Sequence, residues 1–254
     1  MTTTLEIDSV THRFDTPSGG VEAVRDISVE VAEHEFVAIV GPSGCGKTTV
    51  LNIVSGLLNP TSGGVRFEGR PIEGVHPEIG YMPARDSLYP WRTCLRNVTL
   101  PMEFRGLGDN RSRKETAREL MASVGLAGFE DSFPNALSHG MRQRVAIART
   151  FASRPRLLLM DEPFSALDSQ TKLVVQDLFL RIWEEHRQTV LLITHDIMEA
   201  VALADRVIVF SARPGTIKAV YDIDLPRPRS VQDLVFDSAE FQSHIRRIWR
   251  DLHD

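Results

Sequence analysis

The residues best suited to chemistry are a glycine-rich stretch with one lysine: Gly41, Pro42, Ser43, Gly44, Cys45, Gly46, Lys47, Thr48 and Thr49. The stretch matches the pattern G-x-x-x-x-G-K-[ST], in which glycines let backbone N–H groups curve around phosphate oxygens. Lys47 would neutralise the β and γ phosphates, and the Thr48 hydroxyl would bind Mg²⁺. A glycine-rich turn that binds nothing is the alternative, but a chance match in a chain of this length is roughly 1%. We therefore predict a nucleotide-binding phosphate loop.

Two adjacent carboxylates, Asp161 and Glu162, follow the apolar run Leu157–Met160. Asp161 would hold Mg²⁺ through its water shell, and Glu162 would act as general base on the water that attacks the γ-phosphate. Acidic residues after a strand are by themselves equally compatible with a surface turn. The presence of the phosphate loop favours the functional interpretation of these carboxylates. We therefore predict Thr48 and Asp161 as metal ligands and Glu162 as a catalytic residue.

His195 follows a further apolar run, Val190–Ile193, and is the second catalytic candidate. In open parallel sheets, ligands gather at the carboxyl ends of the strands. We therefore expect His195 at the same edge of the sheet as Glu162. A lone histidine is more often structural, so its position alone does not establish a role.

Two kinds of strand are predicted. Apolar runs at 36–40, 157–160, 190–193 and 207–210 are typical of strands buried on both faces of a parallel sheet. Alternating segments near residues 5–7, 27–31 and 65–68 indicate half-buried strands, and 48–57 is a predicted helix. The fold class is therefore α/β, a P-loop NTPase with a parallel-rich central sheet and an antiparallel N-terminal β region.

Residues about 84–150 are predicted to form a helical insertion. Ser112 and Glu115 have the spacing of a capping box, and Gly125 stands where that helix would stop. A tail of about 211–254 contains the turn LPRPR and ends in an amphipathic helix, which we expect to pack on the domain. Since there is no internal repeat, residues 1–254 are predicted to be a single domain.

The composition restricts the possible partners and compartment. With 29 basic and 34 acidic residues, the net charge is −5, which argues against nucleic acid as the main partner. No apolar run approaches the ~18 residues that a membrane span needs, and the N-terminus has no apolar secretory segment. Cys45 and Cys94 form no metal or redox motif. These features predict a soluble, cytoplasmic, reduced protein.

The stretch Leu137-Ser138-His139-Gly140-Met141-Arg142-Gln143-Arg144 resembles the signature motif of ABC ATPases. Most of the chain then aligns with that family: the glycine-rich stretch is similar to its Walker A loop, Asp161-Glu162-Pro163 to its Walker B end, residues 165–168 to its D-loop, and His195 to its switch histidine. The resemblance implies the ABC cassette fold, with ATP and Mg²⁺ as cofactors and Phe14 stacked on adenine. It further implies a homodimer, or a pair with a sister cassette. In that dimer four residues contact the ATP of the other subunit: Ser138, His139, Gly140 and Asp168.

Finer features resemble the ATPases of nitrate, sulfonate and taurine importers. They are residues 88–93, the Met-Arg-Gln-Arg after the signature, residues 212–215 and the LPRPR turn. This resemblance implies transmembrane permease subunits as partners, a solute-binding protein as an indirect one, and a place at the cytoplasmic face of the membrane. Trp91 would then line a groove for the permease, the alternative being a core position.

Two positions depart from the family. The glutamine that approaches Mg²⁺ and the attacking water is replaced by Ala84, which leaves Asp86 or Arg85 to take over its role. His139 replaces the first glycine of the signature, where an imidazole would crowd the phosphate or donate to it. Both changes bear on the rate of hydrolysis rather than on ATP binding.

Two other classes of function stay open beside the importer ATPase. A soluble ABC ATPase of translation or DNA repair would carry two cassettes or a long coiled-coil insertion, and the sequence has neither. A degenerate cassette that binds ATP for regulation is favoured by Ala84 and His139 and opposed by Glu162 and His195.

Overall fold

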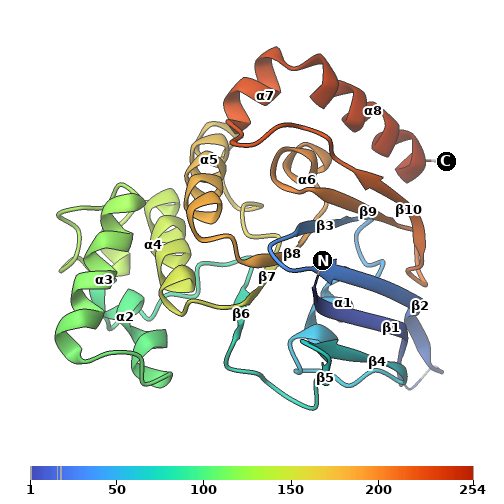
Figure 1. The fold of residues 1–254 in the computed structure, drawn as a ribbon, viewed down its shortest axis with the longest axis horizontal. Helices are drawn as coiled ribbons and strands as arrows, with labels where there is room; N and C mark the ends of the chain where they lie inside the picture. The colour runs from blue at the N-terminus through green and yellow to red at the C-terminus, as the bar shows by residue number, and fades with distance from the viewer. Residues whose placement is uncertain (1, 16, 18, 254) are drawn as a thin grey trace.

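The computed structural model describes residues 2–15, 17 and 19–253 and contains two sheets (Figure 1). The larger sheet has the order β10-β9-β3-β8-β7-β6 and is parallel except for β10, which runs antiparallel to β9. Its strands are β3 (Phe36–Val40), β6 (Ile79–Met82), β7 (Leu157–Asp161), β8 (Thr189–Thr194), β9 (Arg206–Phe210) and β10 (Ile217–Asp222). The predicted α/β fold with a parallel-rich central sheet is confirmed.

The smaller sheet is antiparallel and has the order β2-β1-β4-β5. Its strands are β1 (Thr3–Phe14), β2 (Val21–Ala32), β4 (Ser62–Phe67) and β5 (Arg70–Pro71). Leu5 and Ile7 of β1 are buried, whereas Glu6 between them is only half-buried, as the alternation of the sequence predicted.

The apolar runs of the larger sheet are explained by two hydrophobic clusters, one on each face. Phe36, Ala38 and Val40 belong to one cluster, while Val37 and Ile39 belong to the other. Because successive side chains of a strand point to opposite faces, a strand covered on both sides needs apolar residues at every position. All five residues of β3 are accordingly buried.

Helices cover both faces of the larger sheet (Figure 1). One face carries α5 (Ser169–His186), α6 (Ile197–Leu203), α7 (Val231–Asp237) and α8 (Ala239–His253), and the other carries α1 (Lys47–Val54) and the smaller sheet. Within the described residues, none of the helices combines the length and the apolar character that crossing a bilayer requires.

Three helices lie beside the β6 edge of the sheet (Figure 1). They are α2 (Cys94–Phe104), α3 (Asn110–Ser123) and α4 (His139–Ala152), with a short 3₁₀ helix, Pro134–Ala136, before α4. All of them come between β6 and β7 in the chain.

The N-terminus of α3 differs from the predicted capping box. Asp109 is the cap, and its carboxylate accepts a hydrogen bond from the Ser112 N–H at 2.7 Å, while Glu115 pairs with Arg111 at 2.9 Å. The prediction of Ser112 as the cap is wrong because the helix already begins at Asn110, so Ser112 lies inside the first turn. The predicted stop is confirmed, since Gly125 follows the helix with φ 69° and donates to the Ala122 carbonyl at 2.9 Å.

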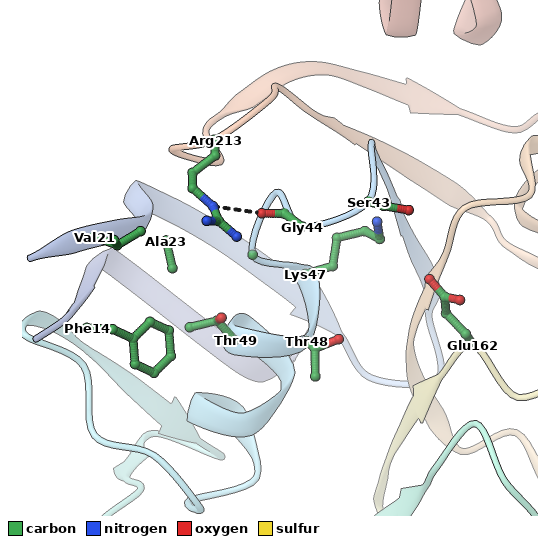
Figure 2. A pocket seen from close by; sticks show the side chains of 11 residues that line it. Phe14, Val21, Ala23, Ser43, Gly44, Lys47, Thr48, Thr49, Glu162 and Arg213 are labelled. Atoms are coloured by element: carbon green, nitrogen blue, oxygen red, sulfur yellow. Dashed lines mark hydrogen bonds between the residues drawn. The ribbon is translucent and has the colours of Figure 1, made fainter. Parts of the chain in front are cut away.

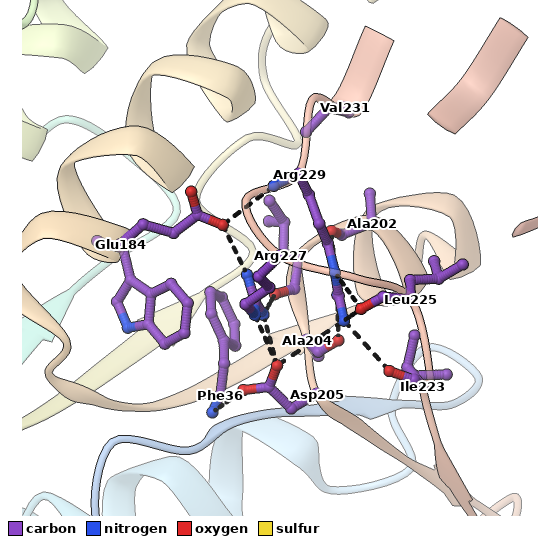
Figure 3. Close-up of polar contacts among 12 residues, drawn as sticks. Phe36, Glu184, Ala202, Ala204, Asp205, Ile223, Leu225, Arg227, Arg229 and Val231 are labelled. Atoms are coloured by element: carbon purple, nitrogen blue, oxygen red, sulfur yellow. Dashed lines mark hydrogen bonds and ion pairs between the residues drawn. The ribbon is translucent and has the colours of Figure 1, made fainter. Parts of the chain in front are cut away.

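The LPRPR turn anchors the tail to the domain through two arginines (Figure 3). Arg229 is buried and donates to the carbonyls of Ala204 at 2.7 Å and Leu225 at 2.9 Å. Arg227 stacks on Trp183 at 4.4 Å and pairs with Asp205 at 2.7 Å. The tail is therefore held by buried, charge-assisted contacts.

The last helix packs on the domain, as expected for an amphipathic tail helix. Phe241 and Ile248 of α8 are fully buried in the same cluster as Phe36. Trp249, on the predicted apolar face, is nevertheless 53% exposed.

Candidate active site

The phosphate loop joins the end of β3 to the start of α1. Gly46 precedes the helix with φ 100°, and a Cβ there would lie 2.4 Å from the Val24 side chain and 2.6 Å from the Ala23 carbonyl oxygen. Only glycine combines this backbone conformation with so close a contact to β2. The first N–H groups of α1 have no carbonyl partner within the helix, which makes this end suited to an anion.

An open pocket of about 420 Å³ lies over this loop (Figure 2). It brings together predicted residues from distant parts of the chain: Phe14, Ser43, Gly44, Gly46, Lys47, Thr48, Thr49 and Glu162. Phe14 is 42% exposed and packs edge-on against His12 at 4.5 Å, so its ring is available to a flat ligand.

Three residues of the predicted loop are not among those that line the pocket: Gly41, Pro42 and Cys45. Cys45 is only 1% exposed, and its side chain belongs to the hydrophobic cluster that includes Val50 and Leu51 of α1. Gly41 and Pro42 contribute carbonyl oxygens, which accept hydrogen bonds from the Lys47 ammonium at 2.7 and 3.0 Å. These two hydrogen bonds hold the Lys47 ammonium close to the phosphate loop, which takes its positive charge from this group.

Thr48 and Asp161 meet at the corner expected to hold a metal. The Thr48 hydroxyl oxygen lies 3.4 Å from Asp161 Oδ1, and the Tyr81 hydroxyl donates to Asp161 Oδ2 at 3.1 Å. Burial raises the pKa of Asp161. The hydrogen bond from Tyr81 has the opposite, smaller effect on that pKa. Hydroxyl and carboxylate oxygens fit Mg²⁺, which commonly takes one or two protein carboxylates together with substrate phosphates. A group of three or more His, Cys, Asp or Glu ligands is not found in the described part of the chain.

Glu162 and His195 are in direct contact. His195 Nδ1 lies 3.0 Å from Glu162 Oε2, because β7 and β8 are parallel neighbours that end at the same edge of the sheet. Glu162 has a left-handed backbone with φ 46°, and its N–H donates to the Ile193 carbonyl at 2.9 Å. Such a backbone is uncommon for a non-glycine residue and is found at functional sites. The imidazole can therefore orient the carboxylate at the edge of the pocket.

A partly buried ionic cluster supports the segment that carries His195. Asp196 caps α6 by accepting from the Met198 N–H at 2.9 Å, and Lys172 pairs with Asp196 at 2.7 Å and Glu199 at 2.9 Å. Burial raises the pKa of Glu199, while Lys172 acts against that change. Because Lys172 joins α5 to α6, it fixes the start of the helix next to His195.

The signature residues lie together away from the pocket. Ser138 caps α4, Asp168 caps α5, and a Cβ on Gly140 would lie 2.6 Å from the side chain of Thr171 in α5. Packing against Thr171 within the same chain is therefore one reason for a glycine at position 140. Among the described residues, none from this signature group lines the phosphate-loop pocket.

His139 and Asp86 are joined through one arginine of α4. Arg142 pairs with Asp86 at 3.0 Å, and its guanidinium lies 3.1 Å from His139 Nδ1. Asp86, one of the two residues considered as substitutes for the missing glutamine, therefore has its carboxylate bound to α4, whereas Arg85, the other one, is exposed. Ala84 lies just beyond the point where Met82 of β6 pairs with Met160 of β7, close to the edge that carries Asp161.

Two polar side chains of the site, those of Tyr81 and Arg213, were not predicted from the sequence. Tyr81 reaches Asp161 because β6 pairs with β7, and Arg213 lines the pocket from the turn between β9 and β10. The sequence indicates the Ala-Arg-Pro-Gly stretch that contains Arg213 only as a feature shared with the importer subfamily. No local pattern indicated that it would reach the phosphate loop.

A family model of the ABC transporter matches residues 24–165. The uncharacterized ABC transporter ATP-binding protein MJ0412 of Methanocaldococcus jannaschii is 45% identical over 97% of this chain and 91% of its own length. The nitrate import ATP-binding protein NrtD of Synechococcus elongatus is 43% identical over 92% of this chain and 86% of its own.

Solved structures of an ABC cassette share the fold. A dimeric post-hydrolysis state of the cassette MJ0796, bound to ADP and Pi, matches with 32% identity and a TM-score of 0.75, covering 87% of this chain and all of that one. A second dimeric structure of MJ0796 matches with a TM-score of 0.76. With a P-loop pocket, a Walker B carboxylate pair and these relatives, the chain belongs to the ABC transporter family, as a cassette that binds and hydrolyses ATP.

Proposed function

We propose that this cassette powers an importer for a small anionic or organic solute of the nitrate, sulfonate or taurine kind. The contact between Glu162 and His195 at the edge of the phosphate-loop pocket is the observation that supports ATP hydrolysis. The observation that carries import is the 43% identity to a nitrate import ATP-binding protein.

The predicted residues in and beside the pocket have distinct roles in the proposed reaction. Phe14 stacks on adenine, and Lys47 and the N–H groups of the loop bind the β and γ phosphates. Glu162, oriented by His195, takes a proton from the attacking water. Thr48 and Asp161 hold Mg²⁺, which neutralises phosphate charge when bound.

A second cassette completes the proposed site. Ser138, His139, Gly140 and Asp168 lie outside the pocket of their own chain, so they would reach ATP only across a dimer interface. The N-terminus of α4, capped by Ser138, would then present its N–H groups to the γ-phosphate of the partner's nucleotide. The dimeric MJ0796 structures support this arrangement, with either a second copy or a sister cassette.

The permease is proposed to bind at a groove beside α2. This groove of about 500 Å³ is lined by Tyr89, Leu100, Pro101, Phe104 and Arg105, among others. Phe104 is 83% exposed, and Trp91, 71% exposed, packs against Tyr89 at 5.3 Å. Exposed aromatic residues around a groove are typical of protein interaction sites. Trp91 is therefore not a core residue, and it stands at the rim of the groove rather than inside it.

The proposed organisation follows from these sites. Residues 1–254 form one cassette, with a helical insertion of about 84–150 that carries the permease groove and a tail of about 211–254. A permease bound at this groove would hold the protein at the cytoplasmic face of the membrane, where the solute-binding protein acts on it only through the permease.

A regulatory cassette with slow hydrolysis is the second candidate. Ala84 favours it, since a methyl group cannot orient the attacking water, and so does His139 in the signature. The intact pair of Glu162 and His195 opposes it.

Reconstitution of the cassette with its cognate permease tests the proposal. In proteoliposomes with the cognate binding protein, we expect nitrate, taurine or an alkanesulfonate to stimulate ATP hydrolysis. The matched control replaces Phe104 with Ser, which should uncouple hydrolysis from the solute but leave basal hydrolysis unchanged. If none of these solutes stimulates hydrolysis while the isolated cassette hydrolyses ATP, the importer assignment is wrong.

A further inference from the structure

The turn between β9 and β10, residues 211–216, is clamped to the nucleotide pocket from two sides. The Gly215 N–H donates to the Ala23 carbonyl at 2.9 Å, and the Gly215 carbonyl accepts from the Arg25 N–H at 2.9 Å. A Cβ on Gly215 would lie 2.1 Å from the carbonyl oxygen of Cys45, so only glycine permits this approach. The turn therefore has a fixed position against both β2 and the phosphate loop.

Arg213 extends from this turn over the phosphate loop (Figure 2). Its Nε donates to the Gly44 carbonyl at 3.0 Å, and a Cβ on Gly44 would lie 3.4 Å from its Nη2. The guanidinium lines the same pocket as Phe14 and Lys47. One nitrogen thus anchors the group, and the two terminal nitrogens are left for a ligand.

The charge of Arg213 has no carboxylate partner in the described part of the chain, where no Asp or Glu oxygen is found within 4.0 Å of its guanidinium. Arg227 of the LPRPR turn differs in this respect, since it pairs with Glu184 and Asp205. A cation that is positioned by a backbone carbonyl but left without a counter-ion is suited to an anionic ligand.

We infer that Arg213 binds the nucleotide itself, at the α-phosphate. This inference rests on the proposed assignment of the pocket to ATP. Figure 2 places Arg213 on the side of Gly44 that faces Phe14 and Ala23, whereas Lys47 lies on the opposite side of the loop, toward Glu162. If adenine stacks on Phe14 and the β and γ phosphates lie at Lys47, the α-phosphate lies between them, within reach of Arg213.

Equilibrium titration of ATP, ADP and AMP against Arg213→Gln tests the inference. Because all three nucleotides carry the α-phosphate, the loss of a charge-assisted contact should weaken all of them by a similar factor, about tenfold. Arg213→Lys keeps the charge without the fork of nitrogens and should lose less. Arg111→Gln, which removes an exposed arginine of α3, is the matched control and should leave all three affinities unchanged.

The alternative is that Arg213 only orders the phosphate loop through Gly44. The loss in Arg213→Gln would then grow with the number of phosphates at the loop, being largest for ATP and absent for AMP, and that result would overturn the inference. Unchanged affinity for all three nucleotides would overturn it as well. Lys47→Ala separates this failure from that of the proposed function: if Lys47→Ala also leaves ATP binding unchanged, the pocket is not the nucleotide site at all.

Discussion

Replacing Ala84 with Gln should accelerate ATP hydrolysis by the isolated cassette. Ala84 lies two residues beyond Met82, whose pairing with Met160 brings this segment next to Asp161 and Glu162. A glutamine amide from here would orient the water that Glu162 activates. One such positioning contact changes a rate by about ten- to a thousandfold, or roughly 1.4–4 kcal/mol. Since Ala84 is only half-buried, water weakens the contact, and we expect the lower end, about tenfold.

Steady-state phosphate release at saturating ATP measures this effect. Ala84→Met is the matched control, because methionine has nearly the length of glutamine but no amide, and it should leave the rate unchanged. An equal increase with Met would mean that side-chain size rather than the amide is responsible. If Gln and Met both have no effect, the segment after β6 takes no part in hydrolysis and the reasoning is refuted.

Three further experiments, two substitutions and one labelling measurement, test other parts of the structure. Lys172→Met should reduce the free energy of unfolding by about 3 kcal/mol in chemical denaturation, because it leaves the buried Glu199 without its cation. The double variant with Glu199→Gln should recover much of that loss. If the double variant recovers none of it, the ion pair is not the source of the stability. Maleimide should label neither Cys45 nor Cys94 in the folded protein and both in denaturant, since both are buried; rapid labelling of native Cys45 would contradict its placement. Tyr81→Phe should raise the Mg²⁺ concentration that half-saturates fluorescent-ATP binding by about fivefold, the value of one hydrogen bond, and an unchanged midpoint would exclude a role at Asp161.

The strands and the phosphate loop could be predicted from sequence because their signals are local. The run Phe36–Val40 was predicted as a strand buried on both faces, and its residues alternate between two hydrophobic clusters as that prediction requires. The loop pattern needs no distant residue to be recognised. The start of α3 is not predictable in the same way, because Asp109 and Ser112 are both good caps and the sequence does not show which one the chain uses.

Contacts that depend on how distant segments meet could not be predicted in this way. Tyr81 reaches Asp161 through the pairing of β6 with β7, and Arg213 reaches Gly44 because the turn after β9 lies against β2. The ion pair of Asp86 with Arg142 likewise follows from where α4 lies beside the sheet, and it engages one of the two residues considered as substitutes for the missing glutamine. In each case the side chain has no distinctive sequence neighbourhood, so only the fold reveals its partner.

The central claim is that Glu162, held by His195, is the base of an ATP-hydrolysing site, and Glu162→Gln tests it most directly. The amide keeps the shape of the side chain but cannot accept a proton, so single-turnover hydrolysis of Mg-ATP should fall by at least about 100-fold. Binding of fluorescent ATP should be retained, and the ATP-bound variant should elute as a dimer in size-exclusion chromatography. Undiminished hydrolysis by a variant that stays monomeric with ATP would contradict both the assignment of the base and the two-cassette site.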